Sequence, residues 1–517
     1  MILVYPPVAR PTEPPAALGR LAGYLARLGI AHECIDGNAE CFLHCYAQDP
    51  SANDTWTKRA TMRKEETLLR LTGAPGYETF DAYVRDVKIL SRVIAKSSLF
   101  DSRFTVSPTD YSDAQLSPYN SGDLEQSFHR FEENPYFEWF EKRIPAALAD
   151  IPRSQPQWLG LSVSYLSQVL TAFAIAGFTR NAFPSIKIVL GGGLLRSWMG
   201  LGAFDELCAR LEMLPWYDEG EAFVDAHIKI DGKIPYCNAA AGLFTVPDYS
   251  FAEKNTYVSP GRVLSYSPTL GCSYRRCAFC SETFEGMAFS TPGNDAAYQG
   301  YLELSRRYRP AGVHFCDHEM SPGLLRRLAD GGAHGAPWYG FSRVIDDFLD
   351  PVFCESLSAS GCKMLCLGIE SGSQRVLDAM EKGIEAVHAG TALTNLAKAG
   401  VRTFCYFLFG TPWEDEASAA ETAFFIKKHS EYIHFANLSI FNLPSRSPVS
   451  AKLDTKRFYG GDLSLYWDFS HPHGWNRKKV RSFISKELLS DKHIRRIIQR
   501  TPPVFSSSHA AFIKRIG

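Results

Sequence analysis

Two stretches within the first 234 residues alternate short apolar runs with helical patterns. Residues 2–7, 31–36, 158–165 and 187–193 are short β-rich runs, and residues 16–28 and 168–181 carry helical patterns between them. Such alternation is typical of an α/β domain of the doubly wound, Rossmann-like kind, built on a parallel sheet. Ligands of these domains bind at the carboxyl ends of the strands, where we expect a ligand edge.

The interval at residues 40–150 does not continue this pattern. It is rich in charged and aromatic residues, with helical stretches at residues 57–71 and 81–97. We interpret it as a largely helical insertion in a domain that spans residues 1–234.

A second α/β alternation follows a turn-rich linker at residues 235–262. Its strand candidates are residues 263–269, 312–317, 338–343, 363–370, 401–410 and 434–441, separated by helical segments. Six such steps predict a (β/α)6 barrel or partial barrel over residues 263–450, with its chemistry at the carboxyl ends of the strands.

Charge is balanced over the whole chain but not at its end. The 517 residues include 55 Lys and Arg against 56 Asp and Glu, a net charge of -1, which argues against a nucleic-acid-binding protein. The C-terminal extension at residues 451–517 is basic, because residues 476–517 hold eleven Lys and Arg against Glu487 and Asp491. A solvated basic helix packed on the body is the simpler interpretation, and a surface for an anionic substrate or partner is the other.

The sequence gives no sign of a membrane or secretory location. The first 15 residues lack a basic region followed by a long apolar core, and the best apolar stretch, residues 170–178, is far below the roughly 20 residues that span a bilayer. We therefore expect a cytoplasmic protein whose thirteen cysteines are thiols or metal ligands rather than disulfides.

Three cysteines stand close together directly after the first strand of the second alternation. Cys272, Cys277 and Cys280 form a C-x4-C-x2-C motif. Three thiolates on one loop can bind three irons of a [4Fe–4S] cluster and leave the fourth iron open for a ligand. A zinc site is the chief alternative, although no fourth Cys or His lies nearby in sequence. Core packing of plain thiols is the remaining one.

This cysteine loop resembles the cluster motif of the radical S-adenosylmethionine (radical SAM) superfamily. Phe279 is the aromatic residue before the last cysteine, and the longer first spacing is similar to that of the subgroup with an N-terminal cobalamin-binding domain. Later motifs follow the family's order, namely FCDHEM at residues 315–320, Arg343, GIESGSQ at 368–374, FLFGTPWED at 407–415 and FNLPSRSP at 441–448.

The resemblance implies an SAM site around the cluster. Asp317 or Glu319 would hold the methionine amine, with Asp317 favoured, and Arg343 would pair with the carboxylate. The remaining contacts implied are Glu370 and Ser371 for the ribose and the turn at Gly410 and Pro412 for the adenine. Arg343 as an ordinary ion-pair residue, Glu370 as a surface carboxylate and the Gly-Pro segment as a mere turn remain alternatives.

The same resemblance implies cobalamin on the N-terminal domain. The matching positions are Ser162 and Ser164 after one strand, Gly191, Gly192 and Gly193 after the next, and Glu219 in YDEGEAF. The first strand–helix loop, residues 6–17, has no histidine, so the corrinoid would lack an axial imidazole from it. A degenerate domain that has lost cobalamin and serves as scaffold is the alternative.

These implications favour a cobalamin-dependent radical SAM enzyme, a C-methyltransferase that uses a 5′-deoxyadenosyl radical and methylcobalamin to methylate an unactivated carbon. Its substrate would be a small molecule or peptide, and a flavodoxin or ferredoxin would supply electrons. A non-methylating radical reaction, such as a ring contraction, a cyclisation or transfer of another SAM fragment, is the second hypothesis. A non-catalytic Fe–S or cobalamin sensor is the third.

Overall fold

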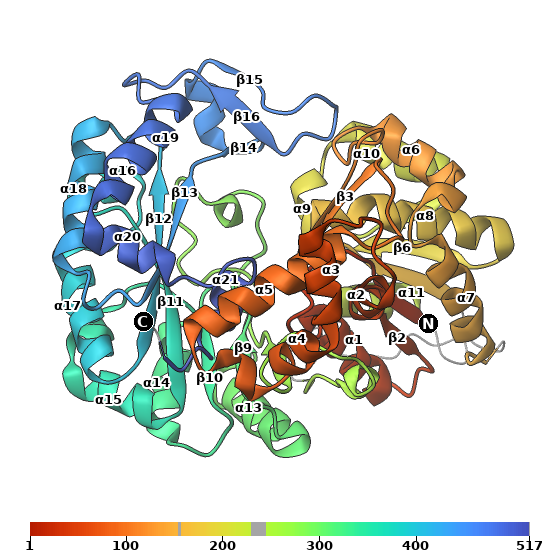
Figure 1. Ribbon diagram of the computed structural model, residues 1–517, viewed down its shortest axis with the longest axis horizontal. Coiled ribbons are helices and arrows are strands. Elements are labelled where there is room, and N and C mark those ends of the chain that lie inside the picture. The colour runs from red at the N-terminus through yellow and green to blue at the C-terminus, as the bar shows by residue number, and fades with distance from the viewer. Residues whose placement is uncertain (153–156, 229–244, 516–517) are drawn as a thin grey trace. The chain divides into compact units, whose positions relative to one another are not determined.

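The computed structural model describes residues 1–152, 157–228 and 245–515. The chain divides into two units (Figure 1). The first is Met1–Val263 with Tyr459–Leu465, and the second is Leu264–Phe458 with Tyr466–Gly517. Of the expected linker, residues 235–244 lie outside the described residues. Residues 245–262 belong to the first unit, where Asp248 and Val258 donate backbone hydrogen bonds to Gly19 and Pro11.

A five-stranded parallel sheet forms the centre of the first unit. Its order is β2 (Glu33–Asp36), β1 (Ile2–Tyr5), β5 (Trp158–Ser162), β6 (Lys187–Gly191) and β7 (Met213–Pro215). The predicted doubly wound fold is thus confirmed, with β7 as a strand that the sequence pattern did not indicate. The strand order reverses between β1 and β5, and such a switch point opens a ligand crevice at the carboxyl ends.

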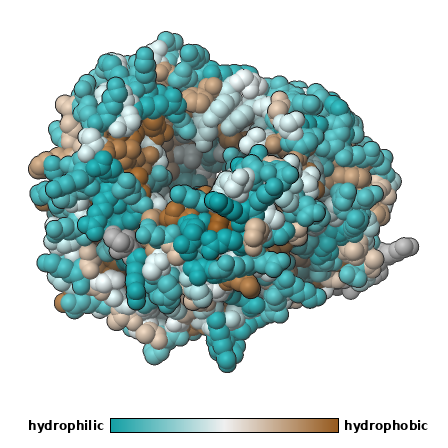
Figure 2. Space-filling model, in the orientation of Figure 1, coloured by the Kyte–Doolittle hydropathy of each residue, from teal (hydrophilic) through white to brown (hydrophobic). Residues whose placement is uncertain are grey.

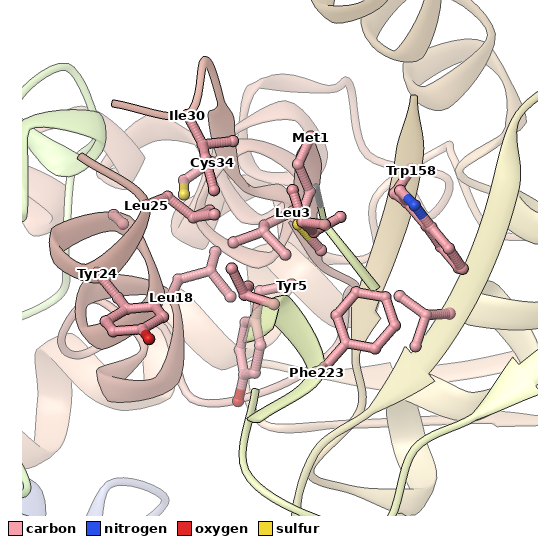
Figure 3. Close-up of a cluster of buried hydrophobic side chains, with 14 of the residues drawn as sticks. Met1, Leu3, Tyr5, Leu18, Tyr24, Leu25, Ile30, Cys34, Trp158 and Phe223 are labelled. Carbon is pink, nitrogen blue, oxygen red and sulfur yellow. The ribbon is translucent and has the colours of Figure 1, made fainter. Parts of the chain in front are cut away.

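Apolar side chains of β1 and of helix α1 (Ala16–Arg27) build one core of this unit (Figure 3). Leu3 and Tyr5 pack with Leu18 and Leu25, all at most 8% exposed. The thiol of Cys34 lies in the same core, so this cysteine has the packing role expected of a buried free thiol.

The insertion is largely helical, as expected. It contains α2 (Gly37–Ala47), α3 (Thr55–Met62), α4 (Lys64–Leu71), α5 (Phe80–Ala95), α6 (Ser121–His129) and α7 (Phe137–Ala149), together with a hairpin of β3 (Phe104–Ser107) and β4 (Asp110–Asp113). The single helix predicted at residues 57–71 is wrong. Arg63 leaves helical geometry (φ −108°, ψ 3°) and bonds back to Ala60, so one helix ends there and another begins.

Six strands in chain order form the sheet of the second unit. They are β8 (Val263–Tyr266), β9 (Gly312–Phe315), β10 (Trp338–Ser342), β11 (Cys362–Glu370), β12 (Arg402–Phe409) and β13 (Phe435–Ile440). Neighbouring strands from β9 to β13 pair in parallel. The connections carry α13 (Asn294–Tyr308), α14 (Pro322–Gly331), α15 (Pro351–Ala359), α16 (Gln374–Ala379), α17 (Ala386–Lys398) and α18 (Glu416–Lys428) (Figure 1). The six predicted strands and the partial barrel are confirmed.

The basic C-terminal segment is folded. Strands β14 (Leu443–Pro444), β16 (Tyr466–Phe469) and β15 (Thr455–Arg457) form a small antiparallel sheet, followed by α19 (Arg477–Lys486), α20 (Lys492–Gln499) and α21 (Ser506–Ala510). The loop Tyr459–Leu465 between β15 and β16 belongs to the first unit. There Tyr459 stacks on Tyr119 with ring centroids 4.4 Å apart.

Hydrophilic residues cover most of the face in Figure 2. Among the described residues, no helix has the length and apolar character needed to cross a bilayer.

Candidate functional site

The cysteine loop leaves the end of β8. Cys277 is buried, and Cys272 and Cys280 are half-buried; all three are free thiols. Short-range bonds fix the loop, since Cys280 N–H donates to the Cys277 carbonyl (3.2 Å) and Thr283 Oγ1 donates to the same oxygen (2.8 Å). Burial raises the pKa of all three thiols, that of Cys280 to about 12. A metal centre would therefore have to stabilise the thiolate form that binds it.

The spacing of these thiols bears on the choice between zinc and a cluster. In the described part of the chain, the three sulfurs do not form a set within 4.8 Å of one another. A tetrahedral zinc with Zn–S bonds of about 2.3 Å holds its sulfurs about 3.8 Å apart. The triad is thus not arranged as the sulfur set of a single zinc ion, and three thiols on one loop are a donor set that suits an iron–sulfur cluster.

The two acidic candidates after β9 differ in their surroundings. Glu319 is 4% exposed, and its Oε2 lies 3.2 Å from Cys272 Sγ and 3.1 Å from Ser273 Oγ. Asp317 is 2% exposed, and its Oδ1 accepts hydrogen bonds from the backbone N–H (2.7 Å) and the hydroxyl of Thr269. The structure thus brings Glu319, rather than the favoured Asp317, against the cysteine loop, while Asp317 anchors the segment that leads into it.

Arg343 follows β10 and also reaches the cysteine loop. Its guanidinium carbon lies 3.2 Å from the ring centroid of Tyr274, and its Nη2 donates to the carbonyls of Lys382 and Gly383, the latter at 3.3 Å. The Tyr274 hydroxyl in turn donates to the Glu381 carbonyl (2.9 Å). A stacked, hydrogen-bonded guanidinium is a fixed positive charge beside the triad.

Glu370 and Ser371 stand at the end of β11, where the register with β12 shifts. Glu370 has a positive φ of 66°, and its carboxylate pairs with Lys382 Nζ at 3.0 Å. Ser371 is fully buried, and its Oγ lies 3.0 Å from Thr422 Oγ1 and accepts the Ser373 N–H at 3.1 Å. In this arrangement the Ser371 hydroxyl holds the loop together, and its role as a ribose contact stays a prediction.

The turn after β12 is held by the C-terminal segment. Gly410 has φ 78°, and its N–H donates to the buried Glu414, whose Oε2 also accepts from Trp475 Nε1 at 2.9 Å. His471 Nε2 lies 2.8 Å from the carbonyl of Thr411, the residue before the buried Pro412. Burial raises the pKa of Glu414 to about 7, against hydrogen bonds from Gly410 and Trp475 that lower it.

In the first unit, the predicted serines and glycines meet at the carboxyl ends of β5 and β6. Ser162 pairs with Gly191 across the two strands, and Ser164 N–H donates to Gln168 Oε1 (2.8 Å). A Cβ added to Gly191 or Gly193 would meet nothing within 4 Å, so the backbone there faces open space. The turn can admit a ligand close to its backbone.

Gly192 has the opposite surroundings. A Cβ there would lie 2.7 Å from the backbone nitrogen of Val163, and its φ is 110°. Glycine at this position is required by the turn itself rather than by a ligand.

Glu219 is engaged within the first unit. Its carboxylate lies 2.6 Å from Arg20 Nη2 and 3.7 Å from Arg196 Nη2, and Arg20 also pairs with Glu221. Burial raises the pKa of Glu219, although the Arg20 charge lowers it. Its assignment to cobalamin remains a prediction.

Sequence reasoning missed several residues that hold the site in the second unit. Lys382, Thr422 and Trp475 come from segments far from the cysteines, and no spacing signal links them to the triad, because only the folded sheet brings them together. Glu414 lies inside the motif at residues 407–415, although the resemblance implies no role for it.

No protein-family model matches the chain. Bacteriochlorophyllide d C-12(1)-methyltransferase of Chlorobaculum tepidum is 28% identical over 207 residues, covering 38% of this chain and 45% of that protein. An uncharacterised methyltransferase of Pyrococcus horikoshii is 25% identical over 191 residues, covering 35% of this chain and 41% of that protein. The match therefore spans less than half the length of these curated relatives.

Solved structures give a longer match. The radical S-adenosylmethionine methyltransferase TsrM of Kitasatospora setae, with cobalamin and a [4Fe–4S] cluster bound, aligns with a TM-score of 0.54 and 12% identity over 96% of this chain and 90% of that one. Its structure with tryptophan substrate and an SAM analogue aligns with a TM-score of 0.53 and 12% identity over 98% and 92%. At this identity the likeness concerns the fold alone, and the chain shares the α/β fold of TsrM, in agreement with the fold class that its sequence predicted.

Proposed function

We propose that this protein is a cobalamin-dependent radical SAM enzyme and, more specifically, a methyltransferase acting on an unactivated carbon. The observation that carries the proposal is the surroundings of the cysteine triad. Two fixed cations, Arg343 and Lys382, and a buried carboxylate, Glu319, lie against one loop of three thiols at the carboxyl edge of the partial barrel. The likeness to TsrM, whose structures hold a cluster, cobalamin and an SAM analogue, supports it.

Each unit would hold its own cofactors. Cys272, Cys277 and Cys280 would bind three irons of a [4Fe–4S] cluster. Around SAM, Glu319 would receive the amine, Arg343 the carboxylate and Glu370 the ribose, and the Gly410–Pro412 turn would border the adenine. The open backbone at Gly191 and Gly193 would lie against the corrin, together with Ser162 and Ser164.

Each group would contribute distinct chemistry. When bound, the cluster supplies one electron for SAM cleavage and the corrinoid carries the methyl group, so the chain's part is to bind, orient and enclose them. Arg343 and Glu319 offer opposite charges to the two ends of an amino acid. The open backbone at Gly191 and Gly193 would let a flat macrocycle approach. We further propose a small-molecule or peptide substrate and a flavodoxin or ferredoxin as electron donor.

An anaerobic reconstitution tests this function. Wild-type protein, supplied with iron, sulfide, cobalamin and methyl-labelled SAM under dithionite, should show a cluster and a corrinoid absorption spectrum and should release 5′-deoxyadenosine. With a substrate present, S-adenosylhomocysteine and a labelled product should also form. The Cys272→Ala, Cys277→Ala, Cys280→Ala variant should bind no cluster, whereas Cys354→Ala, which removes a buried thiol of α15, should keep it.

The results separate the rival functions. A cluster and deoxyadenosine without methyl transfer would indicate a non-methylating radical reaction. Cofactor binding without any SAM cleavage would indicate a sensor, and wild-type protein that takes up no cluster would refute the proposal.

A further inference from the structure

The loop between α16 and α17 is tied to the cysteine loop at several points. Ala278 N–H donates to the Met380 carbonyl at 2.8 Å, and the Tyr274 hydroxyl donates to the Glu381 carbonyl at 2.9 Å. Gly383 has φ 64°, and a Cβ there would lie 2.8 Å from Cζ of Tyr274. The backbone of this loop therefore has one defined position against the triad.

Lys382, in the middle of this loop, points inward. Its side chain is 6% exposed, its Nζ lies 3.0 Å from Glu370 Oε1, and its Nζ is 5.6 Å from the ring centroid of Phe279. The pair also needs Gly368, since a Cβ there would lie 2.7 Å from Glu370 Oε1 and 2.9 Å from Lys382 Nζ. The ammonium thus occupies a specific space and is not a solvated surface charge.

Burying an ammonium is costly unless an opposite charge or a hydrogen bond offsets the loss of water. Burial alone would lower the pKa of Lys382, but the charge of the Glu370 carboxylate is the largest opposing effect, and the pKa lies above its ordinary value, so the side chain is charged. Its loop is hydrogen-bonded to Ala278, the residue after Cys277, and its Nζ lies close to the ring of Phe279, the residue before Cys280. Lys382 is therefore a buried positive charge held against the cysteine loop.

We propose that Lys382, oriented by Glu370, sets the reduction potential of the cluster on this loop by stabilising its reduced form. This inference rests on the proposed function, because it requires a cluster. Adding one electron makes the cluster and its three thiolates one unit more negative, and a nearby buried cation favours the more negative state. Lys382 acts through its charge and contacts no reacting atom. The negative charge of Glu370 offsets part of its effect on the reduction potential.

The midpoint potential of the cluster, measured by redox titration of reconstituted protein without SAM, tests the proposal. Electron paramagnetic resonance follows the reduced cluster, and the iron and sulfide content of each sample is measured. Lys382→Met should shift the midpoint potential to more negative values. Glu370→Gln should shift it to more positive values, and the double variant should return towards wild type. Lys382→Arg, which keeps the charge, should stay near wild type.

The opposite signs distinguish charge from structure. If the role of the pair were purely structural, the midpoint potentials of Lys382→Met and Glu370→Gln would shift in the same direction, or both variants would bind less cluster. Unchanged potentials in fully loaded Lys382→Met overturn the inference and leave the proposed function intact. If Lys382→Met does not load, the Glu370→Gln potential decides, and no positive shift there overturns it. A wild-type protein without a cluster refutes the proposed function itself.

Discussion

Gly192 offers the sharpest test of the turn at the end of β6, because its two neighbours are matched controls. Gly192 has φ 110° and ψ 170°, a region that essentially only glycine adopts. An added Cβ would lie 2.7 Å from N and 2.8 Å from C of Val163, so the obstacle is backbone rather than a flexible side chain. We predict that Gly192→Ala destabilises the first unit.

The size of the effect follows from these contacts. The backbone strain costs about 1–3 kcal/mol. Moving the turn away from Val163 also weakens two backbone hydrogen bonds, from Val163 N–H to the Gly191 carbonyl (2.7 Å) and from Leu194 N–H to the Val163 carbonyl (3.2 Å). The loss of one such hydrogen bond costs about 1 kcal/mol. A total of roughly 2–4 kcal/mol corresponds to a fall in Tm on the order of 10 °C for a unit of this size.

Differential scanning calorimetry measures the change, since it can resolve the transitions of two units. Gly191→Ala and Gly193→Ala meet nothing within 4 Å and should stay within about 0.5 kcal/mol of wild type. Under the proposed function, Gly191→Ala should weaken aquacobalamin binding in an absorbance titration while keeping wild-type Tm. A Gly192→Ala protein as stable as Gly191→Ala would refute the packing argument.

Three further predictions concern contacts that the sequence pattern did not indicate. The pKa of Glu414 is about 7 in the folded protein against an ordinary value of 4.5, because burial favours the protonated carboxyl. The free energy of unfolding that this protonated form contributes is therefore fully present below pH 4.5 and is lost as the pH rises through 7. Wild type should therefore lose roughly 3 kcal/mol relative to Glu414→Gln between pH 4.5 and 8 in urea titrations, and parallel pH profiles would contradict this. Gly383→Ala should lower the cluster content of reconstituted protein, because the added Cβ would collide with Tyr274 of the cysteine loop. Gly400→Ala is the control, since its φ is also positive but its added Cβ would have no neighbour closer than 3.8 Å, so this variant should lose stability and keep the cluster. Equal loss of cluster in both variants would contradict the role of the loop. Asp462→Ala removes the carboxylate that accepts hydrogen bonds from the backbone N–H (2.8 Å) and the hydroxyl of Ser121. Limited proteolysis should therefore cleave the loop Tyr459–Leu465 about tenfold faster or more. An unchanged cleavage rate would show that the other contacts of the loop hold it.

Strand positions could be predicted well because each buried strand is a short apolar run between turns. All six strands of the second sheet lie within the expected ranges or extend one residue beyond them. Strand β7 was missed because it is three residues long and lacks a clear apolar run. The break at Arg63 was missed because the helical pattern continues on both sides of it.

The sequence indicated which residues lie near the cysteine loop, but not the partners that each side chain finds in the fold. Motif order gave Arg343 and Glu319 as candidates, and both lie beside the cysteine loop. It favoured Asp317 over Glu319, because both follow the same strand and only their side-chain partners in the fold differ. Ser371 and Glu219 illustrate the same difficulty, since each is bonded to a residue distant in sequence.

The sequence by itself determined the two α/β sheets, the cysteine triad on its loop and the glycine turn after β6, since these depend on local periodicity and spacing. The tertiary structure alone decided which charges surround the triad. Lys382 lies more than a hundred residues after Cys277 in sequence, and it approaches because parallel strands bring the loops that follow them to one edge. The pair with Glu370 then keeps this buried lysine charged, and that pair forms only in the folded chain.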